Sequence, residues 1–345
     1  MTHRVLVTGA GSGVGNGIVK ALRHSGLPLT IICSDIAPLN VGLFRADEAL
    51  IWPRVEAPEA FDAITRSLGE NTVDLVLIGS EYDLGFFAEH RNAIERASGA
   101  RIVVSPPDTV RMANDKWLTS RFLADNGLPG PATILPEDAD DAVARTADWT
   151  YPVMVKPRTG TSSRHVHMAR DADDLRRLYP SVPAPIVQQM LAMPSRDFAN
   201  EYTATVFKTS DSRVLGPFVA RRTLRGGDSW NLEVSAVGGI DTLMTEIATA
   251  LPVMGTLNVQ MILTDAGPVP FEINARFSGT SAVRAHYGFN DAEMAVRDFL
   301  LGEDLPPPVI GKGMVFRYME EVFVDGVGTA TAADGFTRGE VHRWF

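Results

Sequence analysis

The chain has 345 residues, of which 45% are hydrophobic and 21% are charged, and its formal net charge is -10. This length can bury a substantial core and predicts two or three domains, while the acidic balance argues against a nucleic-acid or anionic-membrane surface. No apolar run is long enough to span a bilayer, the N-terminus does not resemble a signal peptide, and the single cysteine, Cys33, excludes an intrachain disulfide. We therefore expect a cytoplasmic protein.

The first third of the chain alternates short apolar strands with helical stretches. The predicted elements are Val5 to Thr8, Gly15 to His24, Leu29 to Ser34, Asp74 to Ile78 and Arg101 to Val104. Strands that alternate with helices predict right-handed βαβ units and a doubly wound parallel sheet. The alternation of strands and helices stops after Pro106 and Pro107, which places the end of this domain near Met112.

A glycine-rich turn, Gly9 to Gly15, follows the first strand, and Asp35 lies further along the chain. This spacing is typical of a dinucleotide-binding loop, in which backbone amides and a helix N-terminus hold pyrophosphate. A tight turn from strand to helix also requires glycines for steric reasons when nothing binds there. Since no acid-base pair for hydride transfer follows, an NAD-dependent dehydrogenase is the alternative that the sequence supports least.

The next segments predict a different organisation. A helix from Asn114 to Asn126 precedes the turn Pro129-Gly130-Pro131, and a strand runs from Tyr151 to Lys156. From Ile186 onward strands predominate, with helices expected at Gly239 to Leu251 and Asp291 to Leu301. Pro306 to Pro308 then interrupt regular structure before a strand-like stretch.

The stretch from Leu257 to Arg276 predicts a β-hairpin around the turn Asp265-Ala266-Gly267-Pro268. Pairing about this turn would set Gln260 opposite Glu272, with Asn274 on the same face. Carboxylate and amide oxygens without His or Cys favour Mg²⁺, which usually holds substrate phosphates as well. A polar outer face of a hairpin would show the same pattern, so both interpretations stay open.

Asn258-Val259-Gln260 followed by Phe271 to Arg276 resembles the metal-binding end of ATP-grasp enzymes, and the nearest branch is carbamoyl-phosphate-synthase-like. The resemblance implies an ATP-grasp fold of α/β and α+β parts. It also implies four units, namely an N-terminal Rossmann-like pre-ATP-grasp domain (1–112), a central lid subdomain (113–185), a C-terminal subdomain with the metal-binding hairpin (186–305) and a C-terminal extension (306–345).

The resemblance also implies roles for individual residues. The metal ligands would be Gln260, Glu272 and Asn274, and the catalytic residues would be Arg276 and Lys156. The nucleotide contacts would be Lys116 and Lys156 at the phosphates, Ser162 and Ser163 in the lid, Gln189, Met190 and Leu191 at the adenine, and Glu201 near the ribose or the metal. Substrate contacts would come from Glu81, Arg221, Arg222, Arg225 and Arg284. Without the resemblance, Lys116 and the cluster Arg221, Arg222 and Arg225 would be interpreted as solvated surface charges, and the adenine strand as an ordinary apolar strand.

The function that the resemblance implies is an ATP-dependent ligase that joins a small-molecule carboxylate to an amine through an acyl phosphate, with release of ADP and phosphate. Its cofactors would be ATP and Mg²⁺, with Mn²⁺ as an alternative metal. A homodimer is common among relatives. Two alternatives remain: phosphorylation of bicarbonate or carbamate, and a module that binds ATP without catalysis.

Overall fold

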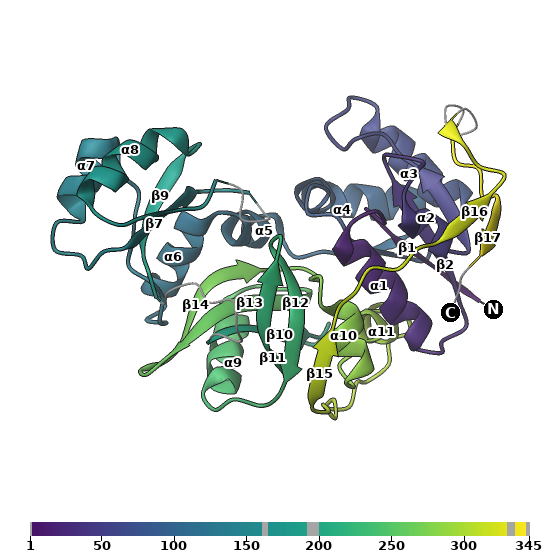
Figure 1. Ribbon diagram of the computed structural model, residues 1–345. Coiled ribbons are helices and arrows are strands. Elements are labelled where there is room, and N and C mark those ends of the chain that lie inside the picture. Colours follow the sequence, from purple (N-terminus) through teal and green to yellow (C-terminus); the bar gives the residue numbers. More distant parts are fainter. Residues whose placement is uncertain (1, 161–164, 192–199, 330–334, 343–345) are drawn as a thin grey trace.

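The computed structural model describes residues 2–160, 165–191, 200–329 and 335–342, and it arranges them around three main sheets. Figure 1 shows the central unit with β7 and β9 projecting on the left, the parallel domain on the right, and a large antiparallel sheet between them. The combination of a parallel sheet with antiparallel sheets confirms the predicted fold class.

The N-terminal domain is a five-stranded parallel sheet in the order β3-β2-β1-β4-β5. Its strands are β1 (His3–Val7), β2 (Leu29–Asp35), β3 (Glu48–Ile51), β4 (Leu75–Leu77) and β5 (Arg101–Val103), and its helices are α1 (Gly13–His24), α2 (Val41–Arg45), α3 (Ala60–Glu70), α4 (Leu84–Ser98) and α5 (Pro107–Asn114). The strand order reverses between β1 and β4, and ligands of such sheets bind where the carboxyl ends of these strands diverge.

The glycine-rich turn after β1 packs too tightly for side chains. A Cβ atom on Gly79 would lie 2.3 Å from the carbonyl oxygen of Thr8, and one on Gly15 would lie 2.4 Å from that of Gly9. The backbone N–H of Gly11 donates to the carboxylate of Asp35 at 2.8 Å, which places a negative charge beside the turn. These contacts favour the steric explanation of the glycines over a pyrophosphate site.

The central unit follows α6 (Lys116–Asp125) and contains a four-stranded sheet in the order β6-β9-β7-β8. Its elements are β6 (Thr133–Ile134), α7 (Ala139–Arg145), β7 (Val153–Pro157), β8 (His167–Ala169), α8 (Ala172–Leu178), a 3-10 turn (Tyr179–Ser181) and β9 (Pro185–Gln189). We expected a domain boundary at residue 185, but β9 pairs with β7 along its length and therefore lies in the central unit.

The largest sheet has six strands in the order β14-β13-β10-β11-β12-β15. The strands are β10 (Glu201–Lys208), β11 (Val214–Arg225), β12 (Asp228–Val234), β13 (Gly255–Thr264), β14 (Gly267–Asn274) and β15 (Gly313–Phe316), and α9 (Ile240–Ala250) covers one face. On the other side, α10 (Ser281–His286) and α11 (Asp291–Ala295) pack against α1, and the π-helical turn (Val296–Leu300) that follows contacts β5. Because β15 belongs to the expected extension 306–345, that segment is partly built into this sheet.

The rest of the C-terminal segment lies against the N-terminal domain, where β16 (Phe323–Asp325) pairs with β17 (Glu340–His342) (Figure 1). Glu320 forms ion pairs with Arg45 and Lys20, and the ring of Phe336 lies 5.3 Å from that of Phe44. These contacts join the large sheet to the first domain through a second connection. Among the described residues, no helix combines the length and the apolar character needed to cross a membrane.

Candidate active site

The hairpin of β13 and β14 has the predicted register at its inner end. Gln260 pairs with Glu272 and Asn258 with Asn274, and the register shifts between Gln260 and Met261. One carboxylate oxygen of Glu272 accepts hydrogen bonds from the side-chain amides of Gln260 and Asn274, both at 2.9 Å. The hairpin therefore gathers the three side chains around a single carboxylate.

Two of these three side chains, Glu272 and Asn274, can offer an oxygen ligand to a hard cation. Glu272 supplies carboxylate oxygen, and Asn274 can turn its amide to present oxygen. The side-chain oxygen of Gln260 instead accepts a hydrogen bond from Arg222 at 2.7 Å. Within the described part of the chain, no group of three or more His, Cys, Asp or Glu could hold a metal. Glu272 and Asn274 alone would be few protein ligands for magnesium, as in sites where substrate phosphates complete the coordination.

Lys156 lies on β7 with its side chain buried. Its ammonium group donates to the side-chain oxygen of Gln188 at 2.6 Å and lies 5.9 Å from the ring centroid of Phe271 on β14. Burial, followed by the nearby charge of Lys116, lowers the pKa of Lys156 to about 8. The strand thus holds a rigid cation, with a readily titrated proton, beside the hairpin.

Lys116 begins α6, where Asp115 caps the helix by accepting hydrogen bonds from two backbone N–H groups. The ammonium group of Lys116 donates to the carbonyl oxygen of Gly160 at 2.9 Å, and Asp115 forms an ion pair with Arg158 at 2.6 Å. Both contacts join α6 to the segment that leads into the predicted lid. The lid residues Ser162 and Ser163 lie outside the described residues.

The predicted adenine segment comes at the end of β9. Gln188 turns its side chain inward, where its amide nitrogen donates to Thr133 at 2.9 Å, whereas Gln189 is exposed. The backbone N–H of Gln189 donates to the carbonyl of Ala132 at 2.8 Å, and the half-buried Met190 and Leu191 follow. Sequence reasoning did not single out Gln188, the neighbour that contacts Lys156.

A cleft of about 600 Å³ lies where the N-terminal domain, the central unit and the hairpin meet. Its lining includes Glu81, Arg111, Gly160, Asn274 and Arg276. Arg276 forms an ion pair with Glu81 at 2.8 Å, so the predicted catalytic arginine contacts a predicted substrate residue of the other domain. Arg111 is a further cleft cation that the sequence did not reveal, because on a surface helix it resembles any solvated arginine.

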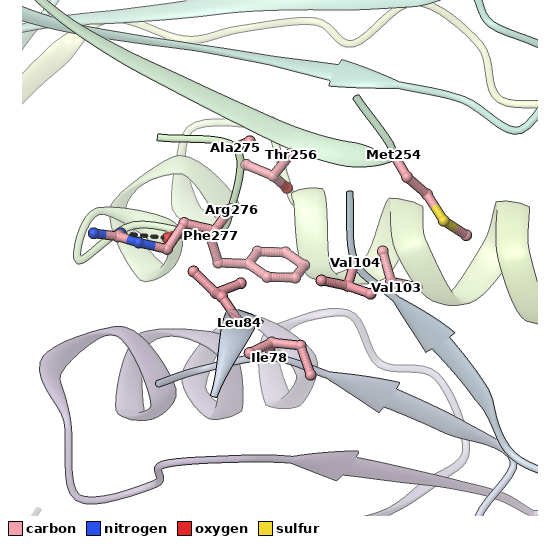
Figure 2. Close-up of a pocket in the computed structure, with 9 residues that line it drawn as sticks. All are labelled: Ile78, Leu84, Val103, Val104, Met254, Thr256, Ala275, Arg276 and Phe277. Carbon is pink, nitrogen blue, oxygen red and sulfur yellow. Dashed lines mark hydrogen bonds between the residues drawn. The ribbon is translucent and has the colours of Figure 1, made fainter. Parts of the chain in front are cut away.

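Arg276 is aimed at this cleft because its neighbour is anchored. Figure 2 shows the ring of Phe277 pointing toward Ile78 and Val104 of the N-terminal domain, while the guanidinium of Arg276 extends the other way. Phe277 is 3% exposed, so its side chain fixes the backbone after β14 to the first domain. Arg276 lies in the bend between the end of β14 and this anchored residue.

The structure does not bring the four predicted substrate arginines to the lining of the cleft. Arg222 is buried and pairs with Glu201 at 2.6 Å, and Arg221 pairs with Glu233 on the opposite face of β11. Arg225 stacks on Trp230 at 4.5 Å.

Arg284 is fully buried and forms an ion pair with Asp291 at 2.5 Å, with further hydrogen bonds to the hydroxyls of Ser278, Thr280 and Ser281. These contacts correct the expectation for Arg284, whose buried partners indicate a structural role.

Comparisons with known proteins agree with this geometry. Residues 113–280 match the family model of the ATP-grasp domain. The carbamoyl phosphate synthase large chain of Halobacterium salinarum is 22% identical over 339 residues, which cover 92% of this chain and 32% of that protein. The mitochondrial propionyl-CoA carboxylase alpha chain of Mus musculus is 26% identical over 168 residues, covering 46% of this chain and 22% of that protein. The chain thus spans about a third or less of the length of these relatives.

Two solved structures share the fold at low sequence identity. The biotin carboxylase domain dimer of Hydrogenobacter thermophilus 2-oxoglutarate carboxylase, in complex with MgADP, ADP and bicarbonate, superimposes with a TM-score of 0.71 at 14% identity, covering 95% of this chain and 80% of that one. The N5-carboxyaminoimidazole ribonucleotide synthetase of Thermus thermophilus gives 0.72 at 15% identity, with 90% and 82% covered.

The match over residues 113–280 confirms the predicted recognition of an ATP-grasp domain, and the predicted ligase activity and cofactors agree with the similar proteins named above. The individual roles assigned to the site residues remain predictions. Residues 113–280 of this chain therefore form an ATP-grasp domain, and the fold around that domain matches the fold of the two solved structures.

Proposed function

We propose that the chain is an ATP-dependent carboxylate–amine ligase that works through an acyl phosphate. The observation that carries this proposal is the cleft in which Asn274 and Arg276 of the hairpin face Gly160 of the central unit and Glu81 of the first domain. Such a cleft can hold the phosphates against the hairpin while a small acid approaches from the N-terminal domain. Its volume of about 600 Å³ is within the range of pockets for small molecules.

The residues of the chain would act mainly by positioning and by neutralising charge, as phosphoryl transfer requires. Lys156 and Lys116 bind phosphate oxygens, and Glu272 and Asn274 hold the magnesium ion, which supplies neutralising charge to the triphosphate. Arg276 leaves its ion pair with Glu81 to bind either the substrate carboxylate or the phosphoryl group that moves to it.

Two displacements complete the proposed reaction. A carboxylate oxygen attacks the γ-phosphorus, the bond from this phosphorus to the bridging oxygen breaks, and ADP leaves. The amine nitrogen then attacks the acyl carbon, the carbon–oxygen bond to phosphate breaks, and the nitrogen loses a proton as the amide forms. Exclusion of water from the cleft protects the acyl phosphate from hydrolysis.

A second candidate substrate is bicarbonate, or the carbamate derived from it. The observation that favours it is the bicarbonate present with MgADP in the structure of the 2-oxoglutarate carboxylase domain, together with the sequence match to carbamoyl phosphate synthase. Under this alternative the same hairpin and lysines would serve, and bicarbonate would replace the organic carboxylate as the phosphoryl acceptor.

The test is release of ADP and phosphate by the full chain with ATP and Mg²⁺, over a panel of carboxylate and amine pairs, with and without bicarbonate. Release that requires one acid and one amine supports the amide ligase, and release that requires bicarbonate alone supports the second candidate. The Glu272→Ala variant should abolish release in either case, because it removes the carboxylate of the metal-binding hairpin. A variant at Arg297, which pairs with Glu293 at 2.8 Å and with Glu303, serves as the matched control.

Absence of stimulated release from any pair, with ATP still bound tightly, would contradict both candidates. That result would support a nucleotide-binding module without ligase activity. Retention of full release by Glu272→Ala would instead reject the assignment of the hairpin to the metal.

A further inference from the structure

The buried arginine on β11 is held by partners from three neighbouring strands. Two nitrogens of Arg222 donate to one carboxylate oxygen of Glu201 on β10, at 2.6 and 3.1 Å. Further hydrogen bonds reach the side-chain oxygen of Gln260 on β13 at 2.7 Å and the hydroxyl of Ser229 on β12 at 3.1 Å. Arg222 is 7% exposed, so its positive charge is fixed within the sheet beside the metal-binding hairpin.

Arg222 also fixes the orientation of the neighbouring amide. The oxygen of Gln260 faces Arg222, and its nitrogen donates to Glu272 at 2.9 Å. Turning the amide over would set its N–H groups against the guanidinium and its oxygen against the carboxylate. Both contacts would then be repulsive, since a guanidinium only donates and a carboxylate only accepts. While Arg222 is present, the side-chain oxygen of Gln260 therefore accepts its hydrogen bond and does not bind a metal.

We propose that Arg222 takes the place of a second divalent cation, so that the site holds one protein-bound metal, on Glu272 and Asn274. Gln260 is then a positioning residue, which links Arg222 to the Glu272 carboxylate. This inference rests on the proposed function, because it concerns the metal that accompanies the nucleotide. Sites of phosphoryl transfer often use two metal ions to neutralise charge, and a fixed guanidinium can supply the same sign of charge.

The balance of charge explains why Arg222 can replace a second metal ion. Glu201 and Glu272 bring two negative charges to this end of the sheet, and Arg222 already neutralises Glu201. Removal of the guanidinium would leave Glu201 without its ion-pair partner and would free the side-chain oxygen of Gln260. Two carboxylates with a nearby amide oxygen are a donor set suited to a hard cation. Loss of Arg222 should therefore create the metal position that it now fills.

The experiment counts bound Mn²⁺ by electron paramagnetic resonance on the full chain saturated with a non-hydrolysable ATP analogue. We expect one ion per nucleotide complex in the wild type and two in Arg222→Met. Arg222→Lys loses the planar fork but keeps the charge, so it should hold one ion. Arg297→Met, which removes an arginine paired with two surface carboxylates, should also hold one.

Comparison of Arg222→Lys with Arg222→Met distinguishes the effect of losing the positive charge from the effect of disturbing the structure. Equal counts in Arg222→Lys and Arg222→Met would overturn the proposal, and so would two ions in the wild-type complex, a result that leaves the proposed function intact. Absence of both nucleotide and Mn²⁺ binding in the wild type would instead reject the proposed function. As a test of positioning, Gln260→Ala should weaken the single Mn²⁺ site by roughly tenfold, as loss of a residue behind a metal ligand does, whereas Glu272→Ala should abolish it.

Discussion

Nucleotide affinity should depend on pH through Lys156. Burial lowers the pKa of this lysine to about 8, and the phosphates of a bound nucleotide favour its charged form. The protonated fraction then falls about tenfold between about pH 7 and about pH 9, which corresponds to about 1.4 kcal/mol of binding free energy. An ordinary lysine would stay charged over this range and would leave the affinity unchanged.

Calorimetric titration of the full chain with a non-hydrolysable ATP analogue at saturating Mg²⁺ measures this effect. Titrations in buffers of different ionisation enthalpy should also show proton uptake on binding above about pH 8, because the nucleotide raises the pKa of the lysine. Lys156→Arg keeps a permanent charge and should remove most of the pH dependence. A wild-type affinity that stays within about twofold over the range, without proton uptake, would refute the reasoning.

Three further changes have expected outcomes. Asp291→Ala leaves Arg284 as a buried charge without its carboxylate partner, so urea denaturation should show a loss of about 3–5 kcal/mol in the free energy of unfolding; a loss below about 1 kcal/mol would contradict the buried ion pair. Asp115→Ala removes the N-cap of α6 and should cost about 1 kcal/mol in the same assay, and an unchanged stability would show that the cap is not needed. Glu81→Gln frees Arg276 from a partly buried ion pair, so the KM for the carboxylate substrate should fall by up to about fivefold, and an unchanged KM would show that the pair does not compete with substrate.

Local patterns in the sequence predicted much of the fold. The alternation of apolar strands and helices up to Met112 predicted the parallel sheet, and the turn after Thr264 predicted the register that sets Gln260 opposite Glu272. Both features depend on neighbouring residues in the chain. The assignment of β9 failed because an apolar strand does not reveal which of two sheets it joins, and its partner β7 lies far away in sequence.

The candidate site could be predicted only where its residues share a strand or a turn. The sequence could not show that Arg222 lies between Glu201 and Gln260, because that contact depends on the pairing of β10, β11 and β13. It equally gave no sign that Arg284 is buried, since its partner Asp291 lies on the next helix. From the sequence alone, an arginine that binds a substrate cannot be distinguished from one that stabilises the interior.

The C-terminal segment restricts how the cleft can open. It adds β15 to the large sheet and then contacts the first domain through Glu320 and Phe336, so these two parts are joined both by the covalent chain and by a separate set of contacts. The central unit with β7 and β9 has its own hydrophobic core and projects from the rest of the molecule (Figure 1). Under the proposed function, the first domain and the large sheet would form one connected unit that binds the acid, and the central unit would carry Lys156 on the other side of the cleft.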